Sequence, residues 1–165
     1  MPATQEEMAA RLGVSLTTVQ AWERGRKPLV NMPHVRLRGL RHCLQAAGAS
    51  PTLLAVWDQA LDADVILAGL AVTDPARHPL ALPLPGQAVT ELLAWPLSGR
   101  PPRQLAGTRV NLHAGRGEIA AVTAALRRAA GQASGEGQRP ATLRHQARLL
   151  LAVASASAAL ERQAA

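Results

Sequence analysis

The apolar positions at the start of the chain repeat at helical spacing over two short stretches. Thr4 and Glu7 stand three residues apart, as in a capping box, and predict a helix that begins at Gln5. Glu6, Ala10 and Arg11 lie off the apolar stripe of this helix, which is expected to end at Gly13. The apolar stripe consists of Met8, Ala9 and Leu12.

A second helix is predicted directly after this glycine, with Ser15 as its cap. Val19 and Trp22 share one side of that helix and are expected to point inward together with Val14. Ala9 is small where two crossing helices approach most closely. The opposite side of the second helix is therefore predicted to be exposed, and it carries Leu16, Thr17, Gln20 and Arg24.

The exposed side of the second helix has the chemistry of a surface that reads DNA. Gln20 offers a donor and an acceptor together, which suits the edge of adenine, and Thr17 can bond either a base or a phosphate. Leu16 can cover a thymine methyl group. The basic residues that follow hold phosphates without reading sequence, and they are Arg24, Arg26 and Lys27, ending at Pro28.

Residues 4–28, TQEEMAARLGVSLTTVQAWERGRKP, resemble the helix-turn-helix of the XRE family of transcriptional regulators, the Cro and phage-repressor type. The match covers 25 of the 165 residues. The resemblance implies double-stranded DNA as a partner and implies that Gln5 touches a phosphate or a base. It places Ser15 beside the base-reading side chains. The full predicted DNA-binding set is Gln5, Ser15, Leu16, Thr17, Thr18, Gln20, Arg24, Arg26 and Lys27.

One departure from the family concerns the helix that its members place ahead of this pair. Only three residues precede Thr4, so this helix is expected to be missing. Either the given chain starts late, or a later helix closes the core, or the domain is degenerate. Glu23, whose family counterpart commonly pairs with an arginine on that helix, is expected to use Arg11 or a downstream arginine. Residues 33–47 are predicted to form the helix that completes the core.

The middle of the chain is predicted to be helical up to about residue 72 and irregular after it. Ser50 and Pro51 open a helix that runs past Leu61 toward Leu70. Residues 75–85 hold four prolines and are predicted to lie on the surface as loop or extended chain. A short helix is expected over residues 87–95, and residues 96–108 are interpreted as a linker or an ordered loop. Residues 108–112 are left unassigned, with loop favoured.

The last third of the chain is predicted to form a helical hairpin. Apolar side chains recur at steps of three and four over residues 118–130 and again from residue 142 to about 163. The segment GQASGEG separates the two helices. The predicted divisions are a helix-turn-helix at 1–30, a helical extension at 31–72, a connection with one short helix at 73–117 and a C-terminal helical segment at 118–165.

Overall composition is weak evidence for function, whereas the distribution of charge along the chain is more informative. The net charge is +7, yet arginine supplies all the basic residues except Lys27, and the abundance of alanine, glycine and proline is typical of a GC-rich bacterial gene. The net charge is +4 over residues 1–48, −4 over 49–98 and +7 over 99–165. The acidic middle is suited to solvent or to a basic partner.

The absence of Phe and Tyr predicts a thin core of Leu, Val and Ala, which favours a homodimer.

No other pattern carries a strong chemical signal. The single cysteine fits a reducing cytosol, and the apolar stretches are too short to span a bilayer, so a cytoplasmic protein is expected. Asp58, Asp62 and Asp64 lack the rest of a calcium loop, and the histidines lack zinc spacing. Gly115 to Gly117 are better explained as a helix cap than as a phosphate loop. Neither metal, cofactor nor enzymatic activity is predicted.

The sequence therefore predicts an all-α protein with an N-terminal helix-turn-helix, a helical extension and a C-terminal helical hairpin. The predicted function is sequence-specific DNA binding by a repressor-like transcriptional regulator, acting as a homodimer, with residues 16–24 in the major groove. The alternative is a helical adaptor that binds proteins through a degenerate helix-turn-helix. In either case the C-terminal helices offer a surface for dimerisation or for a protein partner.

Overall fold

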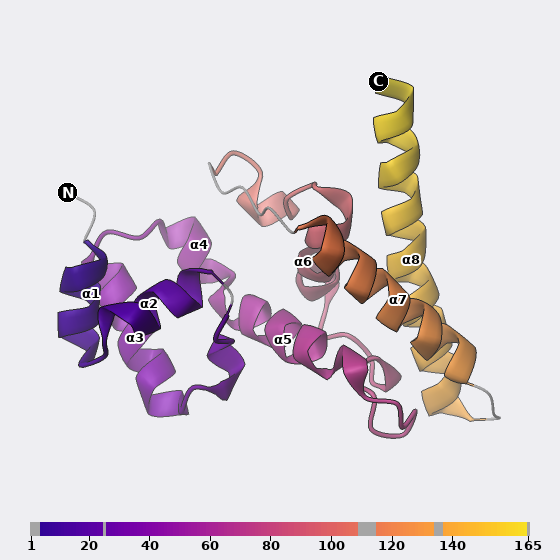
Figure 1. The fold of residues 1–165 in the computed structure, drawn as a ribbon, viewed down its shortest axis with the longest axis horizontal. Coiled ribbons are helices and arrows are strands. Elements are labelled where there is room, and N and C mark those ends of the chain that lie inside the picture. The colour runs from indigo at the N-terminus through magenta and orange to yellow at the C-terminus, as the bar shows by residue number, and fades with distance from the viewer. Residues whose placement is uncertain (1–3, 25, 109–114, 134–136, 165) are drawn as a thin grey trace. The chain divides into compact units, whose positions relative to one another are not determined.

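The computed structural model describes residues 4–24, 26–108, 115–133 and 137–164, with side chains of the last helix described up to residue 156. These residues form eight α-helices and four short 3₁₀ turns, with no strand among them (Figure 1). The predicted all-α class is confirmed. The chain divides into two compact units, Met1–Asp64 and Val65–Ala165. Of residues 108–112, for which a loop is favoured, only Thr108 lies within the described residues.

The first unit is built around three helices. α1 (Gln5–Leu12) packs against both α2 (Leu16–Glu23) and α3 (His34–Ala46), so the third helix predicted to complete the core is confirmed. The 3₁₀ turn η1 (Leu29–Asn31) leads from α2 to α3. One small or branched side chain from each helix is buried in this core, and these are Ala9, Val19 and Leu40.

The segment that follows α3 departs from prediction at one point. A single helix was expected from Ser50 toward Leu70, but the structure has two, α4 (Pro51–Ala55) and α5 (Trp57–Ala68). Val56 separates them with φ −97° and ψ 9°, which interrupts the run of helical hydrogen bonds. Its side chain is only 7% exposed. The apolar pattern continues across the break because Val56 itself belongs to the core.

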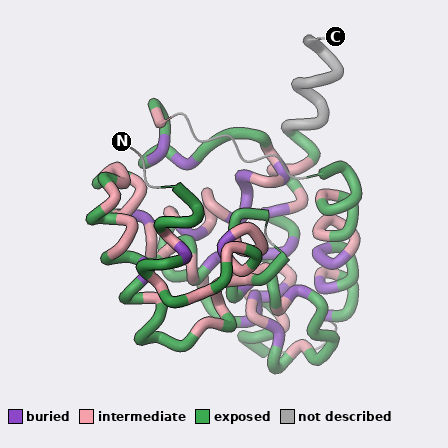
Figure 2. Tube along the Cα trace, turned by 60° about the vertical axis from the view of Figure 1, so that its left-hand side comes forward, coloured by how far each residue is buried: buried purple, intermediate pink, exposed green. Residues whose placement is uncertain are grey.

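The second unit is organised around the long helix α8 (Gln138–Ala164). α8 packs against α7 (Arg116–Gln132), α6 (Gln87–Ser98) and the 3₁₀ turn η3 (Pro79–Ala81). The unit also contains the turns η2 (Gly69–Ala71) and η4 (Arg103–Leu105). α7 and α8 form the predicted C-terminal hairpin. Figure 2 shows buried positions recurring between exposed ones along the helices, and the most deeply buried leucines of this unit are Leu80, Leu93, Leu126 and Leu143.

The prediction that residues 75–85 lie on the surface is wrong for the centre of this segment, although Ala76, Arg77, Pro83 and Pro85 are exposed. His78 is 3% exposed, Leu80 is fully buried and Ala81 is 3% exposed. The turn η3 packs against α8, and the Gln146 side chain of α8 donates a hydrogen bond to the Leu82 carbonyl at 3.0 Å. Leu80 and Ala81 belong to the core, whereas Leu82 is 57% exposed.

Three helix boundaries also differ from prediction, each at a proline or a glycine. α6 continues through Pro96 to Ser98 and ends where the Gly99 N–H donates to the Trp95 carbonyl at 2.8 Å. α8 begins at Gln138, four residues before the predicted start, because Pro140 lies in its first turn, where no backbone N–H is needed. α7 begins at Arg116, two residues before the predicted start.

Candidate nucleic-acid interface

The start of α1 is fixed by the capping box that the sequence predicts. The Thr4 hydroxyl accepts a hydrogen bond from the Glu7 N–H at 3.2 Å, and the Glu7 carboxylate accepts one from the Thr4 N–H at 3.0 Å. These two bonds satisfy backbone donors that the first turn of a helix leaves unpaired. The predicted helix start at Gln5 is confirmed.

The turn between α1 and α2 depends on one glycine and one serine. Gly13 has φ 62°, the left-handed conformation that ends a helix in a single residue. The next N–H, of Val14, donates back to the Ala9 carbonyl at 3.0 Å. The Ser15 hydroxyl then accepts from the Thr18 N–H at 3.2 Å and caps α2. All three features agree with the predicted turn.

The packing of α1 against α2 depends on small and branched side chains. Ala9 is 6% exposed and Val19 is 4% exposed, so the two helices approach closely with little volume between them. Trp22 is half-buried and lines a groove with residues of η1 and α3. On the side of α2 opposite this core, Thr17 and Arg24 are exposed and Leu16 and Gln20 are partly exposed.

Every residue predicted to bind DNA remains accessible in the first unit. Gln5, Ser15, Thr17, Arg24, Arg26 and Lys27 are exposed, and Leu16, Thr18 and Gln20 are partly exposed. Three hydroxyl groups meet at the start of α2, because the Ser15 oxygen lies 2.8 Å from that of Thr17 and 2.9 Å from that of Thr18. Neither Thr17 nor Gln20 belongs to the core, as a reading surface requires.

A polar relay that the sequence did not predict connects the two helices. The Gln5 amide donates to the Glu23 carboxylate, and the Gln20 amide donates to the Gln5 side-chain oxygen at 3.3 Å. Because a carboxylate only accepts, Glu23 fixes which end of the Gln5 amide faces Gln20. Within the part of the chain that the structure describes, the side-chain carbonyl oxygen of Gln20 and its second N–H form no hydrogen bond.

The relay also corrects the expected partner of Glu23. An arginine, either Arg11 or one further along the chain, was expected to pair with it, but Gln5 takes that place. The spacing of the residues contained no signal for this bond. It arises because α1 and α2 cross so that the start of one helix meets the end of the other.

Comparison with protein-family models identifies this segment. Residues 4–32 match the model described as helix-turn-helix. These residues form a helix-turn-helix of the XRE type. The match covers α1, the turn, α2 and η1, so it begins at the predicted residue and extends four residues beyond the predicted end. No curated protein and no solved structure matches the chain.

The basic run that follows the recognition helix of this helix-turn-helix is held close to α2. The N–H groups of Arg26 and Lys27 both donate to the Ala21 carbonyl, at 2.9 and 3.2 Å. Arg24 closes α2 as its C-terminal cap residue. In the described part of the chain, none of these three cationic side chains forms an ion pair, so their charge faces solvent.

The basic side of α3 is only partly available to a ligand of the helix-turn-helix. Arg41 lies 3.6 Å from the Asp58 carboxylate and donates to the Leu54 carbonyl at 3.4 Å, so it joins α3 to α4 and α5. Asp58 therefore has a structural partner. Arg36 and Arg38 of the same helix are exposed.

Two kinds of feature are absent from the described residues. Among them, no three His, Cys, Asp or Glu side chains gather as metal ligands would. None of the described helices has the length and apolar character needed to cross a lipid bilayer.

The helix cap predicted at Gly115 is present, since the Glu118 carboxylate accepts a hydrogen bond from the Gly115 N–H at 2.8 Å.

Proposed function

We propose that this chain is a sequence-specific DNA-binding protein that regulates transcription by placing α2 in the major groove. The observation that carries this proposal is the match of residues 4–32 to the helix-turn-helix family, combined with the exposure of Thr17 and Gln20 on α2. In proteins of this architecture the second helix enters the groove and its first residues meet the base edges. Residues 1–30 are proposed as the DNA-binding division of the chain.

The proposed roles of the side chains follow from where they lie on α2. Leu16, Thr17 and Gln20 read bases, because they share the side of the helix opposite its buried Val19. The oxygen and N–H that Gln20 keeps free match the donor and acceptor on the major-groove edge of adenine. The remaining predicted residues grip the sugar-phosphate backbone, and these are Gln5, Ser15, Thr18, Arg24, Arg26 and Lys27.

The proposed assembly is a homodimer in the bacterial cytoplasm that acts as a repressor. A dimer of helix-turn-helix units binds two half-sites about one helical turn apart, roughly 34 Å. Support comes from the thin core of the chain, which lacks Phe and Tyr and contains many alanines. The operator is therefore expected to be a two-part, pseudo-palindromic sequence.

Binding to labelled duplexes in rising salt tests DNA binding directly. Fluorescence anisotropy is measured with a random-sequence duplex between 50 and 200 mM NaCl, and the affinity is expected to fall steeply as phosphates regain their counterions. The variant Arg26→Gln should weaken binding and flatten the salt dependence, whereas Arg41→Gln should leave both unchanged, because Arg41 is engaged with Asp58. Affinity that does not depend on salt would contradict the proposal.

A second candidate function, an adaptor for proteins, is favoured by one observation. Val35 of α3 is 81% exposed, the highest value among the large apolar side chains that the structure describes. It borders an apolar groove of about 230 Å³ in the first unit, also lined by Leu12, Val14, Trp22, Met32 and Leu40. If the chain is an adaptor, Val35→Ser abolishes its activity in cells while Gln20→Ala has no effect. A DNA-binding regulator gives the reverse result.

A further inference from the structure

The two units differ strongly in charge, and the excess is not in the unit that contains the helix-turn-helix. Among described side chains, the first unit has seven basic and six acidic residues, whereas the second has nine arginines and three acidic residues. A compact unit with this imbalance repels itself, and such surfaces are suited to polyanions. The second unit therefore carries an excess of positive charge over its own acidic residues.

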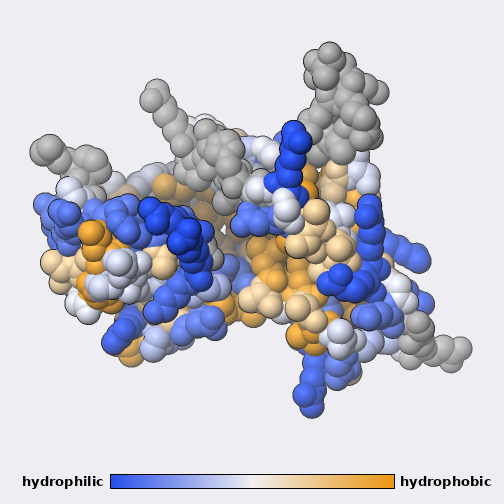
Figure 3. Space-filling model, viewed as in Figure 1, coloured by the Kyte–Doolittle hydropathy of each residue, from blue (hydrophilic) through white to orange (hydrophobic). Residues whose placement is uncertain are grey.

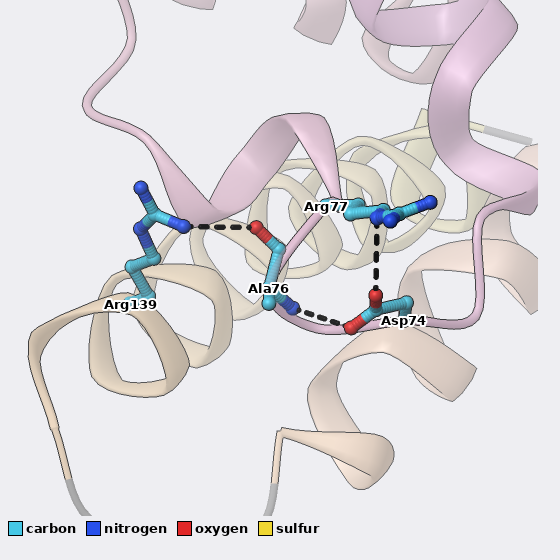
Figure 4. A network of polar contacts seen from close by, with 4 residues as sticks. All are labelled: Asp74, Ala76, Arg77 and Arg139. Atoms are coloured by element: carbon cyan, nitrogen blue, oxygen red, sulfur yellow. Dashed lines mark hydrogen bonds and ion pairs between the residues drawn. The ribbon is translucent and has the colours of Figure 1, made fainter.

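Each of the three described acidic residues of the second unit already has a hydrogen-bond or ion-pair partner. Asp74 accepts from the Ala76 N–H at 2.9 Å and lies 3.6 Å from Arg77 (Figure 4). Glu91 accepts from the Arg103 N–H at 2.9 Å and lies 3.7 Å from its guanidinium group. The third, on α7, caps the start of that helix. No described carboxylate is left to neutralise the arginines of the hairpin.

Six of the seven remaining described arginines lie on α7 or α8, and four of these six form one group. Arg127 and Arg128 are five and four residues before the end of α7 at Gln132, while Arg144 and Arg148 are one turn apart near the start of α8. At 1.5 Å per helical residue, all four lie within about 15 Å of the connected end of the hairpin, measured along its helices. Arg127, Arg128 and Arg148 are exposed and Arg144 is half-buried.

These four side chains have no hydrogen-bond or ion-pair partner within the described structure. Arg139, at the start of α8, differs from them because it donates to the Ala76 carbonyl at 3.3 Å, as Figure 4 shows. Figure 3 shows strongly hydrophilic side chains projecting from the part of the surface that α7 and α8 form. The guanidinium group is the side chain best suited to phosphate oxygens, because its donors form a rigid fork.

We propose that this arginine cluster, Arg127, Arg128, Arg144 and Arg148, binds the sugar-phosphate backbone of double-stranded DNA as a second contact outside the helix-turn-helix. This inference rests on the proposed function, because the helix-turn-helix holds the same chain at DNA and raises the effective concentration of phosphates around the cluster. The cluster adds affinity and salt dependence without reading sequence.

An anionic membrane is the competing source of phosphate groups, but the hairpin lacks the surface that binding to a membrane requires. A helix that lies in a lipid interface needs a continuous apolar face beside its cationic one. Among the described residues of α7 and α8, Leu149 is the one large apolar side chain that is exposed, at 43%. The cluster is therefore assigned to DNA.

The test compares two double variants of the full chain that remove the same charge. Arg144→Gln with Arg148→Gln removes two cluster arginines, and Arg77→Gln with Arg103→Gln removes two arginines paired with carboxylates. Binding to a random-sequence duplex is measured between 50 and 200 mM NaCl. The first variant should reduce the slope of log K against log [NaCl] by roughly 2, at about 0.9 per lost phosphate contact, and the second by less than 0.5.

Three results would overturn the inference. They are an unchanged slope in the cluster variant, equal losses in both variants, or loss of binding to phosphatidylglycerol vesicles with no change on DNA. Circular dichroism verifies that both variants keep their helices, and Arg127→Gln with Arg128→Gln provides a second cluster variant if the first does not fold. Failure of the proposed function would give a different result from failure of this inference. The wild-type chain would then show no preference among duplexes, while the effect of the cluster on random DNA could persist.

Discussion

The side-chain amide of Gln20, on the helix proposed to read bases, donates a hydrogen bond to the Gln5 oxygen on the preceding helix at 3.3 Å. Gln5 is itself held by Glu23. A side chain that contacts DNA is most effective when a neighbouring residue fixes its orientation before binding. In this account Gln5 positions Gln20 in addition to any contact of its own with the backbone.

This relay predicts that Gln5 and Gln20 act together in DNA recognition. Gln20→Ala should cost about 1–3 kcal/mol on the cognate duplex and little on random DNA. Gln5→Ala should also weaken cognate binding, and the double variant should lose less than the sum of the single losses, by at least about 0.5 kcal/mol. Titrations of the four proteins measure this coupling. Gln45→Ala, an exposed change on α3, is the control, and strictly additive losses would contradict the relay.

Two glycines of the first unit predict opposite effects of the same substitution. Gly13 has φ 62° at the end of α1, so Gly13→Ala should lower the free energy of unfolding by about 1–2 kcal/mol. Gly39 lies within α3 with open space where a Cβ atom would be placed, so Gly39→Ala should raise it by about 0.5–1 kcal/mol. Urea unfolding measures both values. Equal effects would show that the turn does not need its left-handed residue.

The buried His78 predicts how stability depends on pH. Its Nδ1 atom accepts from the Leu80 N–H at 3.2 Å, and burial lowers the pKa of this imidazole, an effect that the nearby Leu70 backbone offsets only in part. The unfolded chain takes up a proton on this residue near its ordinary pKa of about 6.5, whereas the folded chain does so only at lower pH. The free energy of unfolding should therefore be greatest above pH 6.5 and fall as the pH decreases below it.

Denaturant titrations between pH 8 and pH 5 measure this dependence. His78→Asn keeps an acceptor for the N–H two residues ahead but does not titrate, so this variant should lose much of the decline below pH 6.5. A decline of the same size in the variant would mean that other groups cause it. Stability that rises as the pH falls would contradict the burial of a neutral imidazole.

The sequence was most informative where structure is local. Thr4, Gly13 and Ser15 each act on a backbone group within five residues, so their spacing was enough to predict both helices and the turn. The exposure of Thr17 and the burial of Val19 followed from helical periodicity in the same way.

The sequence was least informative where distant segments meet. Leu80 is buried because η3 packs on α8, with Gln146 bonded to the Leu82 carbonyl 64 residues earlier, and prolines nearby indicate only a turn. The bond from Gln5 to Glu23 likewise depends on how two helices cross. The break at Val56 left the apolar pattern unchanged, so periodicity alone could not reveal it.

Selection of duplexes from a random library is the most direct test of the central claim that α2 reads bases. The wild-type chain should enrich one motif with two half-sites about one helical turn apart, roughly 10 base pairs. The Gln20→Ala chain should enrich the same motif with one adenine preference lost from each half-site. Failure of the wild-type chain to enrich any motif, or an identical motif from both chains, would contradict the claim.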